Sequence, residues 1–164
     1  MEATYDEDKL AELLLYVADR LRDDRTRAAT KLNKVLFFAE FAHMRQYGRP
    51  ITGADYQKLE FGPAPRRMLP LRTDLVDRGL AEIVEQHYLG YPQQRLVPTC
   101  TIVTILLTAD EIAVVDEVIA DLRNLTARQV SDLSHEEEGW RMVAYGETIP
   151  YESAYLRRPA LTEK

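Results

Sequence analysis

The sequence has one cysteine, three histidines, no long apolar run and no excess of basic residues. With Cys100 alone, neither an intramolecular disulfide nor a cysteine zinc cluster is possible, and a reducing cytoplasm fits this composition. No stretch approaches the roughly 18 apolar residues of a membrane span. The acidic start MEATYDEDKL lacks the basic-then-apolar order of a signal peptide. We therefore expect a cytoplasmic protein that does not enter a membrane.

The charge balance is acidic, with 27 Asp and Glu residues against 21 Lys and Arg residues and a formal net charge of −6. Such a charge repels a phosphate backbone at long range, so nucleic acid is a disfavoured partner. With 46% hydrophobic and 29% charged residues, the composition is that of a globular chain. A length of 164 residues gives room for one real core, so we expect a single domain over residues 1–164.

The common catalytic and metal-binding patterns are missing. The sequence has no G-x-S-x-G motif, P-loop or dinucleotide fingerprint. His43, His87 and His135 are scattered without metal-binding spacing, and His43 shares an apolar helix face, as expected of a hydrogen-bonded core residue. Cys100 lies among apolar residues, an environment that makes a thiol a poor nucleophile. The residues therefore predict no catalytic site, metal or cofactor, and we do not expect an enzyme.

The most informative stretch that is present covers residues 30–48, TKLNKVLFFAEFAHMRQYG. At 100° per residue its apolar residues cover nearly every side, which is typical of a helix buried by several neighbours. Gly48 supplies the residue that ends the helix. The polar residues form one narrow strip at spacings of seven: Asn33, Glu40 and Tyr47. We expect this strip to be the part of the helix that can face a partner or a polar network.

Helical periodicity predicts three further helices in the first half of the chain, over residues 1–23, 54–59 and 66–78. The capping-box pattern Thr4-x-x-Glu7 begins the first, and Thr52 can cap the second. The sequence FGPAP that follows should break regular structure, because glycine frees the backbone and two prolines remove hydrogen-bond donors. This turn either only reverses the chain or presents its aromatic residue for recognition.

From residue 81 the pattern changes to β. The runs 81–89 and 95–103 flank a Gly/Pro turn at residues 90–94 and predict a hairpin. Three capping residues follow, each at the start of a predicted helical segment: Thr108, Thr126 and Ser134. We expect residues 152–164 to form a loose tail. The predicted fold is mainly α with some β (α+β), a single compact helical domain around a central buried helix with one small antiparallel β-hairpin.

Three stretches taken in order are more specific than any single residue. They are KLNKVLFFAEFAHMRQYGRPIT, then YQKLEFGPAP, then LSHEEEGWRMV with a trailing GETIPYE. Over about residues 30–151 this pattern resembles the Panacea domain of SocA-like antitoxins. That family has a K-L-x-K-[LV]-L-[YF]-[YF]-A helix before G-x-P-[IL], then a [YF]-G-P-V turn and a late S-H-x-x-x-x-W. The chain departs from it at Ala64, where the family often has valine, and in a long strand through Ile105.

The resemblance implies a helical domain without catalytic activity that binds and neutralises a toxin protein, one we expect to be encoded next to it. Neutralisation could be direct, or the domain could present the toxin to a protease as an adaptor. The positions that match the family motifs and should determine the fold are Leu32, Lys34, Leu36, Gly48, Gly62, Ser134 and Trp140. Partner contact is expected at Phe61, Pro63 and His135, because a loop and a helix start are more exposed than a core helix.

Other functions are compatible with the same pattern. Helices followed by a hairpin resemble a winged-helix DNA-binding regulator, although the hairpin tip has only Arg95 nearby to grip phosphate. A phage- or mobile-element-associated interaction protein is a second alternative, and a hydrolase that uses histidine and glutamate is a third. The identity of the toxin and the oligomeric state do not follow from the sequence.

Overall fold

The structure is a computed structural model that describes residues 4–24, 28–88 and 90–156. Its helices are α1 (Glu7–Arg20), α2 (Ala28–Tyr47), α3 (Met68–Asp77), α4 (Ala109–Leu122), α5 (Ala127–Glu136), α6 (Glu138–Met142) and the 3-10 helix η1 (Tyr151–Tyr155). Its strands are β1 (Tyr56–Leu59), β2 (Gly62–Pro65), β3 (Ala81–Tyr88) and β4 (Tyr91–Pro98). The predicted fold class, mainly α with some β, is therefore confirmed. None of the helices in the described ranges is long and apolar enough to cross a membrane.

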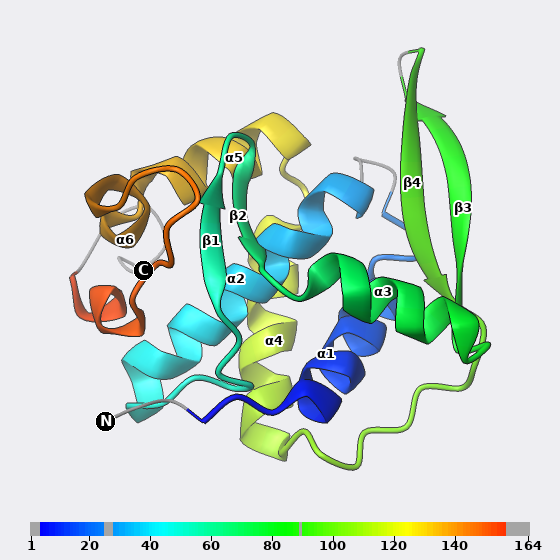
Figure 1. The fold of residues 1–164 in the computed structure, drawn as a ribbon, viewed down its shortest axis with the longest axis horizontal. Coiled ribbons are helices and arrows are strands. Elements are labelled where there is room, and N and C mark those ends of the chain that lie inside the picture. Colours follow the sequence, from blue (N-terminus) through cyan, green and yellow to red (C-terminus); the bar gives the residue numbers. More distant parts are fainter. Residues whose placement is uncertain (1–3, 25–27, 89, 157–164) are drawn as a thin grey trace.

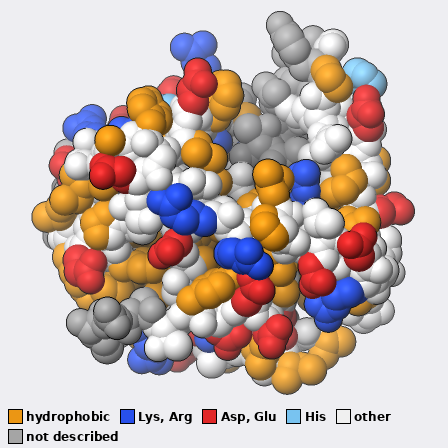
Figure 2. Space-filling model, in the orientation of Figure 1, with side chains coloured by type: hydrophobic (Ala, Val, Ile, Leu, Met, Phe, Trp, Pro, Cys, Tyr) orange, Lys and Arg blue, Asp and Glu red, His pale blue; other side chains and the backbone are white. Residues whose placement is uncertain are grey.

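Helix α2 lies at the centre of the molecule, as predicted. It packs against α1, α4, α5, η1, β2 and β4 (Figure 1). Leu32 and Leu36 are buried on it, together with Phe37 and Phe41. Gly48 ends the helix with a positive φ of 77° and donates its N–H to the Met44 carbonyl at 2.8 Å. Charged and hydrophobic side chains are mixed on the surface that surrounds this core (Figure 2).

Residues 54–59 do not form the predicted helix. Tyr56–Leu59 is strand β1, which pairs antiparallel with β2. The prolines of FGPAP are accommodated because Pro63 and Pro65 lie opposite Lys58 and Tyr56. Both of those β1 residues direct backbone hydrogen bonds away from β2, to residues 146–149, so the prolines occupy positions that need no ladder donor. The strands β1 and β2 therefore form a second hairpin, which was not predicted from the sequence.

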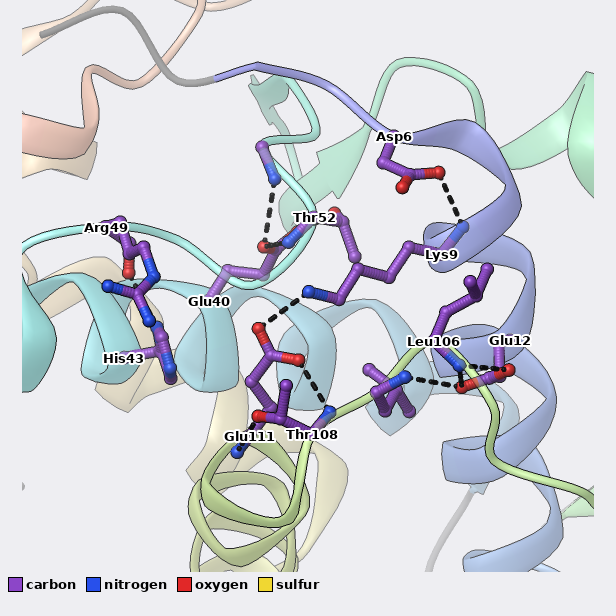
Figure 3. Close-up of polar contacts among 12 residues, drawn as sticks. Asp6, Lys9, Glu12, Glu40, His43, Arg49, Thr52, Leu106, Thr108 and Glu111 are labelled. Atoms are coloured by element: carbon purple, nitrogen blue, oxygen red, sulfur yellow. Dashed lines mark hydrogen bonds and ion pairs between the residues drawn. The ribbon is translucent and has the colours of Figure 1, made fainter.

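The hairpin predicted from residues 81–103 is confirmed, over residues 81–98, and it projects from the helical body (Figure 1). Its pairing runs from Ala81 opposite Pro98 to Tyr88 opposite Tyr91, so residues expected in the turn belong to β4. The strand ends at Pro98 and does not continue through Ile105. Residues 99–107 instead run along the molecule. There the Glu12 carboxylate of α1 accepts the backbone N–H groups of Ile105, Leu106 and Leu107, and Figure 3 shows the contact with Leu106.

Two of the predicted helix starts are wrong. Helix α1 is capped by Asp6, which accepts the N–H of Lys9 at 3.0 Å, and not by Thr4. Ser134 lies within α5 and donates to the Ser131 carbonyl at 2.7 Å, so it opens no helix. Thr126 was predicted to cap a single helical turn, but its capping box begins the whole of α5. The predicted capping box at Thr108 begins α4.

The C-terminal part of the described chain packs on the body. Residues Tyr151–Tyr155 form η1, with Ser153 and Ala154 buried. A loose tail was predicted from residue 152, but residues 152–155 of it belong to η1. Residues 157–164 of that tail lie outside the described part of the chain.

Candidate functional site

Three segments that are distant in sequence meet behind the turn between β1 and β2. Lys34 comes from α2, Gly62 from the start of β2 and Ser134 from α5. A Cβ placed on Gly62 would lie 2.8 Å from Lys34 Cε, 3.3 Å from Lys34 Nζ and 3.5 Å from Ser134 Oγ. Gly62 also has a φ of 134°, which favours glycine. The position therefore needs glycine both for its backbone and for the space that Lys34 occupies.

Lys34 is a buried cationic residue under this turn. Its side chain lies beneath the backbone of Gly62, and the residue is only 4% exposed. Burial lowers the pKa of Lys34 from 10.5 to about 8, because a buried ammonium loses its hydration. Burying an ammonium opposes folding, and residues with a pKa shifted in this way cluster at functional sites.

His135 stacks on Trp140 beside Lys34. The two rings are 4.5 Å apart and inclined by 18°. Burial lowers the pKa of His135, and the positive charges of Lys34 and Lys58 lower it further against the opposing effect of Asp132. Within the described part of the chain, the buried Nε2 atom of His135 has no hydrogen-bond partner. His135 is thus a neutral, stacked ring with one unused nitrogen.

The chain after α6 is held to β1 through Lys58. Its ammonium lies 4.8 Å from the ring centroid of Trp140 and 4.8 Å from that of Tyr145, and donates to the Val143 carbonyl at 3.2 Å. Cation–π contacts of this geometry stabilise by about 0.5–2 kcal/mol. The Gly146 N–H donates to the Lys58 carbonyl at 2.7 Å, so the hairpin and the C-terminal segment form one unit.

The outer surface of this unit is hydrophobic. Phe61 at the turn is 75% exposed and Tyr145 is 67% exposed, and Leu59, which follows Lys58 in β1, is 40% exposed. We call Leu59, Phe61 and Tyr145 the tip face. The turn lies at the upper end of the molecule in Figure 1, where it touches α5, and hydrophobic side chains reach the surface over this end in Figure 2.

The comparisons with known proteins identify a family. The family model described as "Antitoxin SocA-like, Panacea domain" matches residues 32–141, about two thirds of the chain. The chain belongs to this family. Neither the curated proteins nor the solved structures gave a match. Membership of an antitoxin family supports an antitoxin-type role and a non-enzymatic one.

The Panacea domain brings together five of the residues that its sequence motifs single out. Lys34, Gly62, Ser134, His135 and Trp140 form one cluster, whereas Leu32 and Leu36 belong to the general core and Gly48 ends α2 elsewhere. Of the three residues predicted to contact a partner, Phe61 is exposed, His135 is partly buried and Pro63 is buried. Pro63 is buried because it belongs to β2, which packs on α2, and not to an open loop.

Two residues of the Panacea domain site were not predicted. Lys58 and Tyr145 received no role, because the cation–π corner that they build with Trp140 forms only in the folded chain. A signal for Lys58 existed, since it lies within the YQKLEFGPAP motif three residues before Phe61. Tyr145 directly precedes the trailing GETIPYE, although it lies outside the matched range.

The central residue of the polar strip on α2, Glu40, belongs to a buried polar network and does not face an open surface. Glu40 is fully buried and accepts hydrogen bonds from the N–H and hydroxyl of Thr52 at 2.5 Å each (Figure 3). It also accepts from Gly53 N–H at 3.3 Å and from the Tyr56 hydroxyl at 3.1 Å. Burial raises the pKa of Glu40, and these hydrogen bonds oppose the rise. Asn33 is partly buried, and Tyr47 is exposed.

His43 has the structural role that its position on an apolar face predicts. It is buried, and its Nδ1–H donates to the Arg49 carbonyl at 2.6 Å (Figure 3). Its ring also lies 4.6 Å from that of Tyr47. His43 therefore fixes the chain as it leaves α2, and it belongs to the scaffold of the domain.

Proposed function

We propose that this protein neutralises a partner toxin by binding it and covering part of its surface, with the tip face at the centre of the contact. The observation that carries the proposal is Phe61, an aromatic side chain that is 75% exposed on a turn supported from behind by buried residues. Aromatic side chains at the centre of an interface often dominate its binding energy. Membership of an antitoxin family supplies the class of partner.

The support behind Phe61 prepares the tip face for binding. Arg66 donates to Thr148 Oγ1 at 2.9 Å and to the Gly146 carbonyl at 2.7 Å, which ties the hairpin to the C-terminal segment. Ser131 Oγ of α5 donates to the Phe61 carbonyl at 3.3 Å. A surface that is ordered before binding loses less conformational entropy when the complex forms. In this proposal Pro63 and His135 support the contact from within, and Phe61 makes it.

The tip face forms only part of the interface in this proposal. A stable complex buries about 800 Å² on each partner, which is more than one turn can provide. The flanking surfaces of α5 and α6 are therefore the natural extension of the contact. Direct occlusion and delivery to a protease differ in what happens to the toxin: occlusion leaves its half-life in cells unchanged, and delivery shortens it.

Co-expression with the product of a neighbouring gene tests the proposal. The neighbour should be toxic alone and harmless together with this protein. Phe61→Ala should abolish the rescue and weaken binding of the purified toxin at least about tenfold, a typical effect of losing a central aromatic residue. Ile105→Ala is the matched control, because Ile105 is 80% exposed but lies on the loop between β4 and α4.

Two results would contradict the proposal. One is that no neighbouring product is toxic alone and rescued by co-expression. The other is that Phe61→Ala rescues and binds as well as Ile105→Ala.

The structure weakens the case for a winged-helix DNA-binding regulator. The cation nearest the hairpin tip in sequence, Arg95, is buried and donates to the carbonyls of Leu21 and Arg22. It holds the hairpin against α1 and is not free to grip phosphate. Glu82 and Glu85 are exposed on β3, and their charge repels DNA.

A further inference from the structure

The hairpin of β3 and β4 projects from the molecule as a sheet of two strands in the described part of the chain. Strand β4 packs on α1 and α2, and β3 lies farther from these helices in Figure 1. A two-stranded hairpin by itself is at best marginally stable in water, and a third strand or a covering helix stabilises it. The projecting part of this hairpin therefore has room for a third strand beside β3.

The pair formed by Leu80 and Thr99 fixes which backbone groups of the hairpin face outward. Thr99 N–H donates to the Leu80 carbonyl at 2.9 Å, so this pair is hydrogen-bonded. It continues the register of the ladder by one pair. Hydrogen-bonded and non-hydrogen-bonded pairs alternate along an antiparallel ladder. The β3 residues that direct their N–H and C=O groups away from β4 are therefore Ala81, Ile83, Glu85 and His87.

The outer edge of β4 is interrupted by proline, and that of β3 is not. The β4 residues opposite these four are Pro98, Leu96, Gln94 and Pro92. Proline has no N–H, so two of the four outward donors of β4 are missing, which protects an edge from further pairing. Strand β3 keeps its donors, and within the described ranges no other segment pairs with Ile83, Glu85 or His87. Such a row of backbone groups binds an extended strand.

The side chains of β3 define the chemistry of a matching strand. Glu82 and Glu85 are exposed, and Ile83 and Val84 between them are partly buried. Among the described residues Glu82 has no ion-pair partner, and Glu85 has only the His87 ring, at 3.9 Å, which carries a charge only when protonated. Opposite charges on facing residues of neighbouring strands stabilise a sheet, as do pairs of β-branched residues. The best match is therefore two basic residues three positions apart with two β-branched residues between them.

We propose that the outer edge of β3 binds an extended strand with this pattern from a partner protein. Its backbone pairs with Ile83 and Glu85, and its basic side chains lie opposite Glu82 and Glu85. The pattern reads the same in both directions, so it fits a parallel or an antiparallel strand. A second copy of this chain brings the same glutamates and a further net charge of −6, so it lacks the complementary charge. This edge shares no residue with the tip face, and the proposal does not depend on the role of that face.

The probe is a short capped peptide with the order threonine, lysine, two valines, lysine and threonine, added to the isotope-labelled full chain and followed by NMR. We expect saturable shifts of β3 amides and slower hydrogen exchange at Ile83 and Glu85. Glu85→Pro should weaken binding at least about tenfold, because it removes an outward donor without removing a hydrogen bond to β4. Gln94→Pro is the matched control, since Gln94 lies opposite Glu85 on the other edge.

A second variant tests the charge without changing the backbone. Glu82→Lys should also weaken binding at least about tenfold, and Glu136→Lys, at an exposed position on α5, is its control. Thermal unfolding of each variant shows that it is folded, and Glu82→Lys tests the idea even if Glu85→Pro does not fold.

Four results would overturn the proposal. The peptide shifts no amide of β3, a peptide with glutamate in place of lysine binds equally well, or both β3 variants bind as tightly as their controls. The fourth is that the free protein is a dimer that Glu85→Pro dissociates, because the occupant of the edge is then a second copy. Phe61→Ala should leave peptide binding unchanged, which separates this result from the test of the tip face.

Discussion

Replacing Lys34 by methionine should stabilise the protein and change how its stability depends on pH. A pKa that falls from 10.5 to about 8 on folding corresponds to about 3 kcal/mol of stability lost at neutral pH, at about 1.4 kcal/mol for each pKa unit. Methionine has a similar length and no charge to desolvate, so Lys34→Met should recover up to about 3 kcal/mol at pH 7.

The sign of the pH dependence follows from proton binding. Between about pH 8 and the unfolded value of 10.5, the unfolded chain keeps the Lys34 proton while the folded chain releases it. The free energy of unfolding of the wild type should therefore rise with pH in this window, and Lys34→Met should lack that rise. Burial raises the pKa of Tyr16 and Tyr56, so these residues lower stability only near and above their ordinary value of 10.0 and do not disturb the lower part of the window.

Urea unfolding followed by the fluorescence of Trp140, the only tryptophan, measures both effects. The series runs from about pH 7 to about pH 9.5, below the range in which tyrosines titrate. Arg123→Met removes a cation from an exposed position and serves as the control. The reasoning is refuted if Lys34→Met is no more stable than the wild type at pH 7 and its stability rises with pH just as steeply.

Three other substitutions test the contacts around the site. Gly62→Ala should lose about 2 kcal/mol in urea unfolding, because alanine is strained at a φ of 134° and its Cβ displaces Lys34; an unchanged midpoint would be inconsistent with the close approach. Glu40→Gln places an amide donor among the donors of Thr52 and its neighbours, so the free energy of unfolding should fall by about 2 kcal/mol, and an equal melting temperature would contradict this network. Glu12→Ala should cost about 1 kcal/mol and speed hydrogen exchange at the three amides before α4 that its carboxylate binds, whereas unchanged exchange would show that this carboxylate does not hold the loop.

The elements that were predicted well are those whose signals are local. An apolar pattern on all sides identifies α2 as a buried helix, and Thr108 with Glu111 forms the expected capping box. Residues 54–65 were predicted wrongly because strands of four residues are too short for a clear period, and because FGPAP normally argues against a strand. Its prolines are tolerated only because β1 directs its other edge to residues 146–149, a contact that no local pattern reveals.

The site was predicted as a set of residues but not as an arrangement. The motifs contain Lys34, Gly62 and Ser134, yet nothing in their spacing places a lysine ammonium under a glycine of another segment. Exposure was misjudged for Pro63, which is buried because β2 packs on α2, whereas Phe61 is exposed as expected. Whether a charged residue is buried depends on the segments that pack against it. The sequence of its own helix therefore does not predict its burial.

Two of the buried ionisable residues of α2, Lys34 and Glu40, act on the same part of the chain. Glu40 binds the segment that enters β1, and Lys34 lies under the turn that leaves it. Burying either charge opposes folding, so both are poor choices for a helix that serves only as a scaffold. The burial of both residues is explained if the central helix also fixes the turn that carries Phe61. Lys34→Met should then gain stability and lose toxin neutralisation, because the turn keeps its residues but not its support. A variant that gains stability and neutralises as well as the wild type would show that Lys34 is not needed to position the turn.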